Sequence, residues 1–152
     1  MILPDYRKAP THKFPAAPDD CLEVLRYVAS ENGASTLRVD AARIAVGGDS
    51  AGGNLSAVLA QDALKAGISL KHQLLIYPVT SARCHWFKSW RENQNQPILS
   101  TRSMLWFWRE YRPFPFNHDL RAVFPNKNLR HVWKDSFITL SRNIWDLRYD
   151  SE

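Results

Sequence analysis

The chain has 152 residues, of which 45% are hydrophobic and 23% are charged, and its formal net charge is +5. This length is enough for one ordinary domain with a hydrophobic core, and the composition is that of a soluble globular protein. No apolar run is long enough to span a bilayer, and the first five residues do not form a signal peptide. By default we expect a cytoplasmic location, and the sequence leaves open whether a targeting segment lies upstream.

The first predicted helix follows a proline-rich connector, residues 15–18. Asp19 or Asp20 is expected to cap this helix, which runs to about Glu31, and Gly33 stands just past its end. Apolar residues recur at helical spacing on its inward face, and these are Leu22, Leu25 and Val28.

A strand, a tight turn and a helix are predicted next. Residues 43–47 form a short apolar run with β-branched residues, which suits a strand buried on both faces. Residues 55–66 repeat apolar positions at helical spacing, with Lys65 in the last turn and Gly67 as the stop signal.

The second half of the chain contains fewer regular elements. Residues 73–77 predict another apolar strand, and residues 81–99 and 113–134 are expected to be rich in loops. A helix is expected from Ser100 or Thr101 to before Pro113, apolar over most of its surface and therefore buried, and 137–140 is a last strand candidate. Strands that alternate with helices indicate an α/β fold with a mostly parallel sheet.

The turn between the first strand and its helix carries the strongest chemical signal. Its sequence is Gly48-Asp49-Ser50-Ala51-Gly52, followed by Gly53. A serine on so tight a turn exposes its hydroxyl to a base on one side and to a carbonyl carbon on the other. The flanking glycines, Gly48 and Gly52, should allow close approach and unusual backbone angles. The N–H groups of the first helical turn, Ala51 foremost, would point toward a developing oxyanion.

Three segments in the same order resemble the hormone-sensitive-lipase-like branch of the α/β hydrolases, which includes arylacetamide deacetylase-like enzymes. They are Asp5 to Ala17, Arg43 to Leu55 and Leu74 to Pro78. The similarity continues more weakly through residues 90–93 and the aromatic run 104–111, and then fades.

The resemblance implies a carboxylic-ester hydrolase that works through an acyl-enzyme on Ser50, with no cofactor and no metal. The expected substrate is a small-molecule ester. The resemblance further implies that the aromatic run forms an apolar wall of the acyl pocket, through Trp106, Phe107, Trp108 and Tyr111.

The printed sequence departs from the family pattern at two essential parts. It contains no His-Gly-Gly-Gly segment, which in the family supplies oxyanion-hole N–H groups, and no histidine after His131. Alignment places Trp145 at the position of the triad acid, and a one-residue slip would make Asp146 that acid. We therefore expect 1–152 to be a single, incomplete α/β-hydrolase domain, without the early strands and the C-terminal strand and helix. Its parts are a well-matched core (1–80), a loop-rich cap or pocket region (81–134) and a divergent strand and acid-loop region (135–152).

No histidine in the sequence is an obvious base. His12 belongs to a structural segment of the family, and His72 is expected at the surface near the start of a strand. The positions of the other three, His85, His118 and His131, are not fixed by the sequence. Asp49 is expected to orient the turn or contact neighbouring backbone rather than serve as the triad acid.

Charge and cysteine usage add two exclusions. All of the net charge and all six tryptophans lie in residues 81–152, whereas residues 1–80 are neutral overall. A basic, aromatic segment can bind nucleic acid, but a buried helix explains the aromatic run better, so no nucleic-acid partner is expected. Cys21 and Cys84 lack metal-ligand spacing, and Cys21 is expected to be a core or semi-buried free thiol.

The incomplete triad implies that activity is impaired in this chain, and for the isolated chain it favours a second hypothesis. The chain would then be a non-catalytic fragment or pseudo-enzyme that acts, if at all, as an interaction protein. An unpaired sheet edge would favour self-association.

Overall fold

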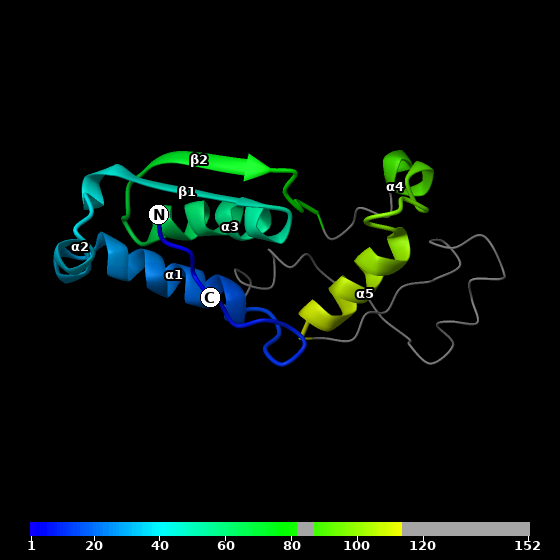
Figure 1. The fold of residues 1–152 in the computed structure, drawn as a ribbon, viewed down its shortest axis with the longest axis horizontal. Helices are drawn as coiled ribbons and strands as arrows, with labels where there is room; N and C mark the ends of the chain where they lie inside the picture. Colours follow the sequence, from blue (N-terminus) through cyan, green and yellow to red (C-terminus); the bar gives the residue numbers. More distant parts are fainter. Residues whose placement is uncertain (82–86, 114–152) are drawn as a thin grey trace. The chain divides into compact units, whose positions relative to one another are not determined.

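The computed structural model describes residues 1–81 and 87–113 (Figure 1), and the chain divides into two compact units, 1–80 and 81–152. The first unit contains five regular elements and one short 3-10 helix. These are α1 (Ala16–Ala29), α2 (Glu31–Leu37), η1 (Ala41–Arg43), β1 (Ile44–Asp49), α3 (Ala51–Lys65) and β2 (Leu70–Ile76). The described part of the second unit contains α4 (Lys88–Glu92) and α5 (Thr101–Tyr111).

The first unit has two layers (Figure 1). β1 and β2 pair in parallel, and α1 and α3 lie together on one face of the two strands. In the pairing register Asp49 stands beside Ile76, so both strands end at the same edge of the sheet. This strand–helix–strand order confirms the predicted α/β class with a parallel sheet.

The core of this unit lies between the helices and the strands. Leu25 and Val28 of α1 pack with Ile44 of β1 and Ala63 of α3, and all four are buried. Leu25 and Val28 therefore face inward as predicted. β1 differs from expectation: its residues alternate between covered and exposed, because among the described residues the helices cover one face of the strands. The prediction of a strand buried on both faces is wrong for β1.

α1 begins at Ala16, earlier than the expected caps at Asp19 and Asp20. Pro18 is accommodated because the first turn of a helix has no use for its missing N–H. Gly33 also has a different role, since it lies inside α2 and not beyond the end of a helix. A Cβ at Gly33 would stand 1.9 Å from the carbonyl oxygen of Tyr27, so close approach to α1 requires glycine there.

The end of α3 follows the sequence prediction. The helix stops at Lys65, and Gly67 adopts a φ of +70°. The Gly67 N–H donates to the Leu64 carbonyl at 3.2 Å and the Ile68 N–H donates to the Ala63 carbonyl at 2.8 Å. These bonds satisfy carbonyls that the last turn would otherwise leave unpaired. β2 begins at Leu70, three residues before the predicted start.

In the second unit, α5 confirms the predicted start after Ser100 and the stop before Pro113. The Ser100 hydroxyl caps the helix by accepting from the Ser103 N–H at 3.2 Å. The expected burial is wrong for part of it, because Trp106 and Phe107 are each about half exposed while Trp108 is buried. The segment expected to be loop-rich also contains the short helix α4.

Candidate active site

Ser50 alone joins β1 to α3, since the strand ends at Asp49 and the helix begins at Ala51. Its backbone angles are φ 50° and ψ −113°. Non-glycine residues rarely adopt such angles, which cost of the order of 1–3 kcal/mol and occur where the surrounding structure enforces them. The unusual angles were expected at the flanking glycines, and they lie instead on the serine itself. This is the geometry of a hydroxyl held clear of its own backbone.

The two flanking glycines have different roles. A Cβ at Gly48 would stand 2.4 Å from the carbonyl carbon of Gly52, so the strand and helix meet here without room for a side chain. A Cβ at Gly52 would meet nothing within 4 Å. The expected close approach is therefore confirmed between Gly48 and Gly52, and of these two positions it is Gly48 that must lack a side chain. The second tight position is Gly53, whose Cβ would stand 3.0 Å from Pro78.

Hydrogen bonds fix the backbone of Ser50 on both sides. Its N–H donates to the carbonyl of Ile76 at 2.9 Å. Its carbonyl accepts from the N–H of Asn54 at 3.0 Å and from the N–H of Val79 at 3.3 Å. The loop after β2 is thus attached directly to the serine turn.

Sequence reasoning missed Asn54 and the loop residues 77–79. The Asn54 side chain donates from Nδ2 to the Val79 carbonyl at 2.6 Å. Tyr77 has a φ of 34°, the third positive φ among the described non-glycine residues, after Arg38 and Ser50. One feature of the sequence could have indicated the role of Asn54. It stands in the first turn of the predicted helix, where a side-chain amide can reach backbone groups outside the helix.

The start of α3 offers free donors beside Ser50. Within the described residues the N–H groups of Ala51, Gly52 and Gly53 have no acceptor, as is usual in the first turn of a helix. The dipole of this 15-residue helix makes its N-terminus partially positive. An oxyanion formed on a substrate attacked by Ser50 could be stabilised there.

The Ser50 hydroxyl makes no hydrogen bond within residues 1–81 and 87–113. The neighbouring Asp49 carboxylate is exposed and has no hydrogen-bond or ion-pair partner in that same part of the chain. The expected backbone contact of Asp49 is therefore not made.

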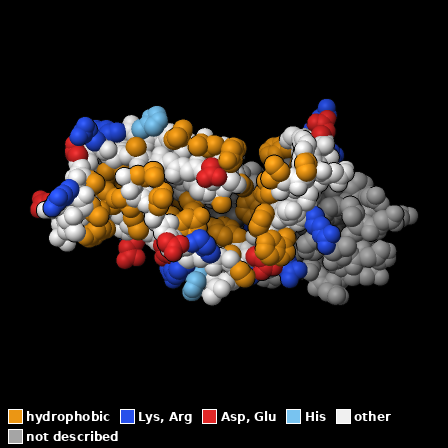
Figure 2. All heavy atoms as spheres, in the orientation of Figure 1, with side chains coloured by type: hydrophobic (Ala, Val, Ile, Leu, Met, Phe, Trp, Pro, Cys, Tyr) orange, Lys and Arg blue, Asp and Glu red, His pale blue; other side chains and the backbone are white. Residues whose placement is uncertain are grey.

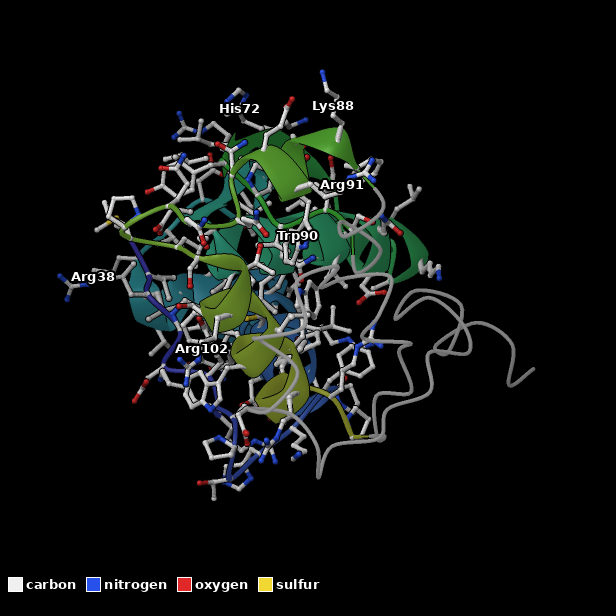
Figure 3. All side chains as sticks on the ribbon, turned by 90° about the vertical axis from the view of Figure 1, so that its right-hand side faces the viewer. Arg38, His72, Lys88, Trp90, Arg91 and Arg102 are labelled. Carbon is white, nitrogen blue, oxygen red and sulfur yellow. The ribbon has the colours of Figure 1, made fainter. Side chains whose placement is uncertain are left out.

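Two histidines belong to the described residues, and neither contacts Ser50. His72 pairs with Ala45, four positions before Asp49 along β1, so it lies roughly 13 Å from the serine end of the strand. Figure 3 shows its side chain pointing away from α1 and α3, and the residue is exposed as predicted. His12 is also exposed, and its backbone N–H donates to the Lys8 carbonyl at 3.0 Å.

Several predicted residues lie outside the described part of the chain. They are Asp146, Trp145, Cys84, the strand candidate 137–140 and the histidines His85, His118 and His131. The expected pocket residues Trp106, Phe107, Trp108 and Tyr111 lie on α5, and their relation to a substrate stays a prediction. The rings of Trp106 and Phe107 meet edge to face, with centroids 5.2 Å apart.

Arg7 and Asp20 form an ion pair between the N-terminal segment and α1. Asp20 accepts from the Arg7 backbone N–H at 2.8 Å and from the Arg7 guanidinium at 2.7 Å. These hydrogen bonds lower the pKa of Asp20 to about 2. Cys21 is a buried free thiol, as predicted, and burial raises its pKa. The described residues contain no cluster of side chains that could hold a metal ion.

Sequence relationships agree with this geometry. The family described as alpha/beta hydrolase fold matches residues 1–139. The chain belongs to this family. Within this α/β-hydrolase family, arylacetamide deacetylase of Bos taurus is 40% identical over 133 residues, which cover 85% of the chain and 33% of the relative. Carboxylesterase NlhH of Mycobacterium tuberculosis is 52% identical over 100 residues, or 65% of the chain and 30% of the relative.

Solved α/β-hydrolase structures have the same fold. An esterase from the fungus Rhizomucor miehei superposes with a TM-score of 0.66 at 34% identity, covering 84% of this chain and 36% of the esterase. A thermostable esterase from Pseudomonas putida gives 0.67 at 35% identity, covering 72% and 34%. The chain thus spans about a third of the length of these relatives. No helix that the structure describes is long and apolar enough to cross a membrane.

Proposed function

We propose that the chain carries the nucleophile of a carboxylic-ester hydrolase, and that Ser50 is this nucleophile. One observation carries the proposal: Ser50 has strained angles at a strand-to-helix turn whose first amides have no acceptor among the described residues. Relatives named as esterases and deacetylases support the same reaction class.

In the proposed reaction the Ser50 Oγ attacks the carbonyl carbon of the ester, and its proton passes to a base. The Ala51 N–H donates to the oxyanion of the tetrahedral intermediate. The C–O bond to the alcohol then breaks, and the alcohol leaves with a proton from the base. Water attacks the acyl-enzyme, which releases the carboxylic acid and restores the Ser50 hydroxyl.

The reaction needs a general base beside Ser50. A histidine nitrogen must come within about 3 Å of the Ser50 Oγ, and neither described histidine does so. Asp146 remains the candidate acid that would orient such a histidine. Activity of the chain by itself therefore depends on residues outside the described part, or on a base supplied in trans.

The proposed substrate is a small-molecule ester with an apolar acyl or aryl group. The family resemblance assigns an acyl-pocket role to the aromatic residues Trp106, Phe107, Trp108 and Tyr111 of α5. Small-molecule sites are lined mainly by such side chains. The relatives named arylacetamide deacetylase support an aromatic group on the substrate.

A fluorophosphonate probe tests the proposal, because it labels a serine only when that serine is activated. We expect labelling of the purified chain, and loss of that labelling in the Ser50→Ala variant. Ser56→Ala is the matched control: Ser56 lies two turns along α3, is buried and should leave labelling unchanged. Absence of labelling in the unmodified chain would refute activity of this chain.

A second candidate function is supported by the surface of the first unit. Among the described residues β1 pairs only with β2, so its other edge carries unpaired backbone groups. A groove of about 790 Å³ with apolar side chains lies along β1 and includes Leu3, Leu25, Ile44, Val46, Leu55 and Leu59. Figure 2 shows hydrophobic side chains exposed on this unit.

We propose that a second copy of the chain binds at this edge. An unpaired strand edge is a template for another strand. Residues 1–80 carry no net charge, so two copies of this unit would not repel each other.

A further inference from the structure

The Asn54 side chain connects two segments that are far apart in the sequence. Its Nδ2 donates to the carbonyl of Val79, 25 residues later, at 2.6 Å, and the bond is partly buried. The backbone N–H of the same residue donates to the Ser50 carbonyl at 3.0 Å. One residue therefore contacts both the serine turn and the loop that follows β2.

Val79 completes a closed set of hydrogen bonds. Its N–H donates to the Ser50 carbonyl at 3.3 Å, while its own carbonyl accepts from Asn54. The Ser50 carbonyl thus has two donors, one from each segment. The loop also packs tightly on α3, because a Cβ at Gly53 would lie only 3.0 Å from Pro78.

The Ser50 carbonyl matters because it belongs to the same peptide group as the Ala51 N–H. That group is planar and trans, so its C=O and N–H point in opposite directions. Two donors on the carbonyl therefore determine the direction of the Ala51 N–H. They also polarise the peptide, which strengthens its N–H as a donor.

We propose that Asn54 is a positioning residue for the Ser50 site. Its side-chain amide holds Val79 in place. The backbone N–H groups of Val79 and Asn54 then orient the Ser50–Ala51 peptide, so that the Ala51 N–H points toward an oxyanion. This inference rests on the proposed function and assigns a role to a residue that does not itself touch the substrate. The strained angles of Ser50 are kept in place by the same contacts.

The experiment compares Asn54→Asp and Asn54→Ala with a matched control, Gln73→Ala. Gln73 Nε2 donates to the Ser56 carbonyl at 3.0 Å, so it makes the same kind of bond from β2 to α3, away from the Ser50 peptide. All three variants lose an amide donor to a backbone carbonyl, and a general loss of stability would affect them alike.

Two measurements are made on each protein: the rate of fluorophosphonate labelling at Ser50 and the hydrogen exchange of the Val79 amide. In both Asn54 variants we expect labelling to slow about tenfold and the Val79 amide to exchange faster, with neither change in Gln73→Ala. Labelling and exchange equal to those of the unmodified chain would overturn the proposal. So would equal losses in Gln73→Ala.

The two proposals can fail separately. If the unmodified chain is not labelled, the hydrolase function fails, and the exchange of the Val79 amide still decides whether Asn54 holds this loop. If both Asn54 variants unfold, NMR of the unmodified chain supplies the test. A scalar coupling between the Asn54 side-chain amide and the Val79 carbonyl supports the contact, and its absence overturns it.

Discussion

Gly53 packs directly against Pro78: a Cβ at Gly53 would lie 3.0 Å from both the Cα and the Cβ of Pro78. The neighbouring residue, Gly52, lies in the same helical turn and has open space at that position. α3 and the loop after β2 are therefore in contact at Gly53 and not at Gly52.

This difference predicts opposite effects of two similar substitutions. Gly53→Ala should lower the free energy of unfolding by about 1–3 kcal/mol, because the backbone of Pro78 must shift. Gly52→Ala should be neutral or raise it by up to about 1 kcal/mol, because alanine is the better helix former. Urea unfolding of both variants measures the difference. Equal effects would show that the contact with Pro78 does not constrain Gly53.

The strain at Ser50 predicts a conflict between stability and chemistry. Glycine adopts a φ near 50° easily, whereas alanine retains the strain. Ser50→Gly should therefore be more stable than Ser50→Ala by about 1 kcal/mol, and neither should react with a fluorophosphonate. Denaturant unfolding of the two variants checks the order. An alanine variant as stable as the glycine variant would mean that the turn relaxes without the serine.

The Arg7–Asp20 pair predicts a pH dependence of stability. The pKa of Asp20 is lowered to about 2 by its hydrogen bonds with Arg7, below its ordinary value of 3.8. The pair's contribution is therefore present above about pH 4 and is lost as the pH falls from about 4 toward 2. Stability should decline through this window in the unmodified chain and less steeply in Asp20→Asn.

Asp49→Asn is the control for this experiment, because Asp49 is exposed and has no partner among the described residues. Thermal unfolding at several pH values between 2 and 6 gives the comparison. A decline as steep in Asp20→Asn as in the unmodified chain would assign the acid sensitivity to other carboxylates.

Much of the first unit could be predicted from local signals. The apolar run before Ser50, the helical spacing after it and the stop at Gly67 each act within a few residues, and all three are confirmed. The position of Ser50 between strand and helix also followed from its five-residue motif.

What the sequence did not reveal depends on contacts between distant segments. Asn54 and Val79 are 25 residues apart, and their roles arise because parallel pairing brings the end of β2 at Ile76 beside the end of β1 at Asp49. The position of the strain is a similar case. Glycine is the usual residue for a positive φ, but here hydrogen bonds from both sides impose it on Ser50. The half-exposed rings of α5 could not be predicted either, because the sequence pattern of a helix does not show how many other segments cover that helix.

The open edge of β1 leads to the last prediction, which concerns self-association. Ala45 lies on β1 and is exposed, and a lysine there should hinder strand pairing, as charged residues do on natural edge strands. We expect the unmodified chain to sediment as a dimer or larger species, and Ala45→Lys to shift it toward the monomer. Leu64→Lys is the control, because Leu64 is 81% exposed on α3 and lies off the strand edge. Analytical ultracentrifugation measures the size of each species. A chain that is monomeric throughout would exclude the edge of β1 as a binding surface for a second copy. An equal shift in Leu64→Lys would attribute the association to general hydrophobic exposure.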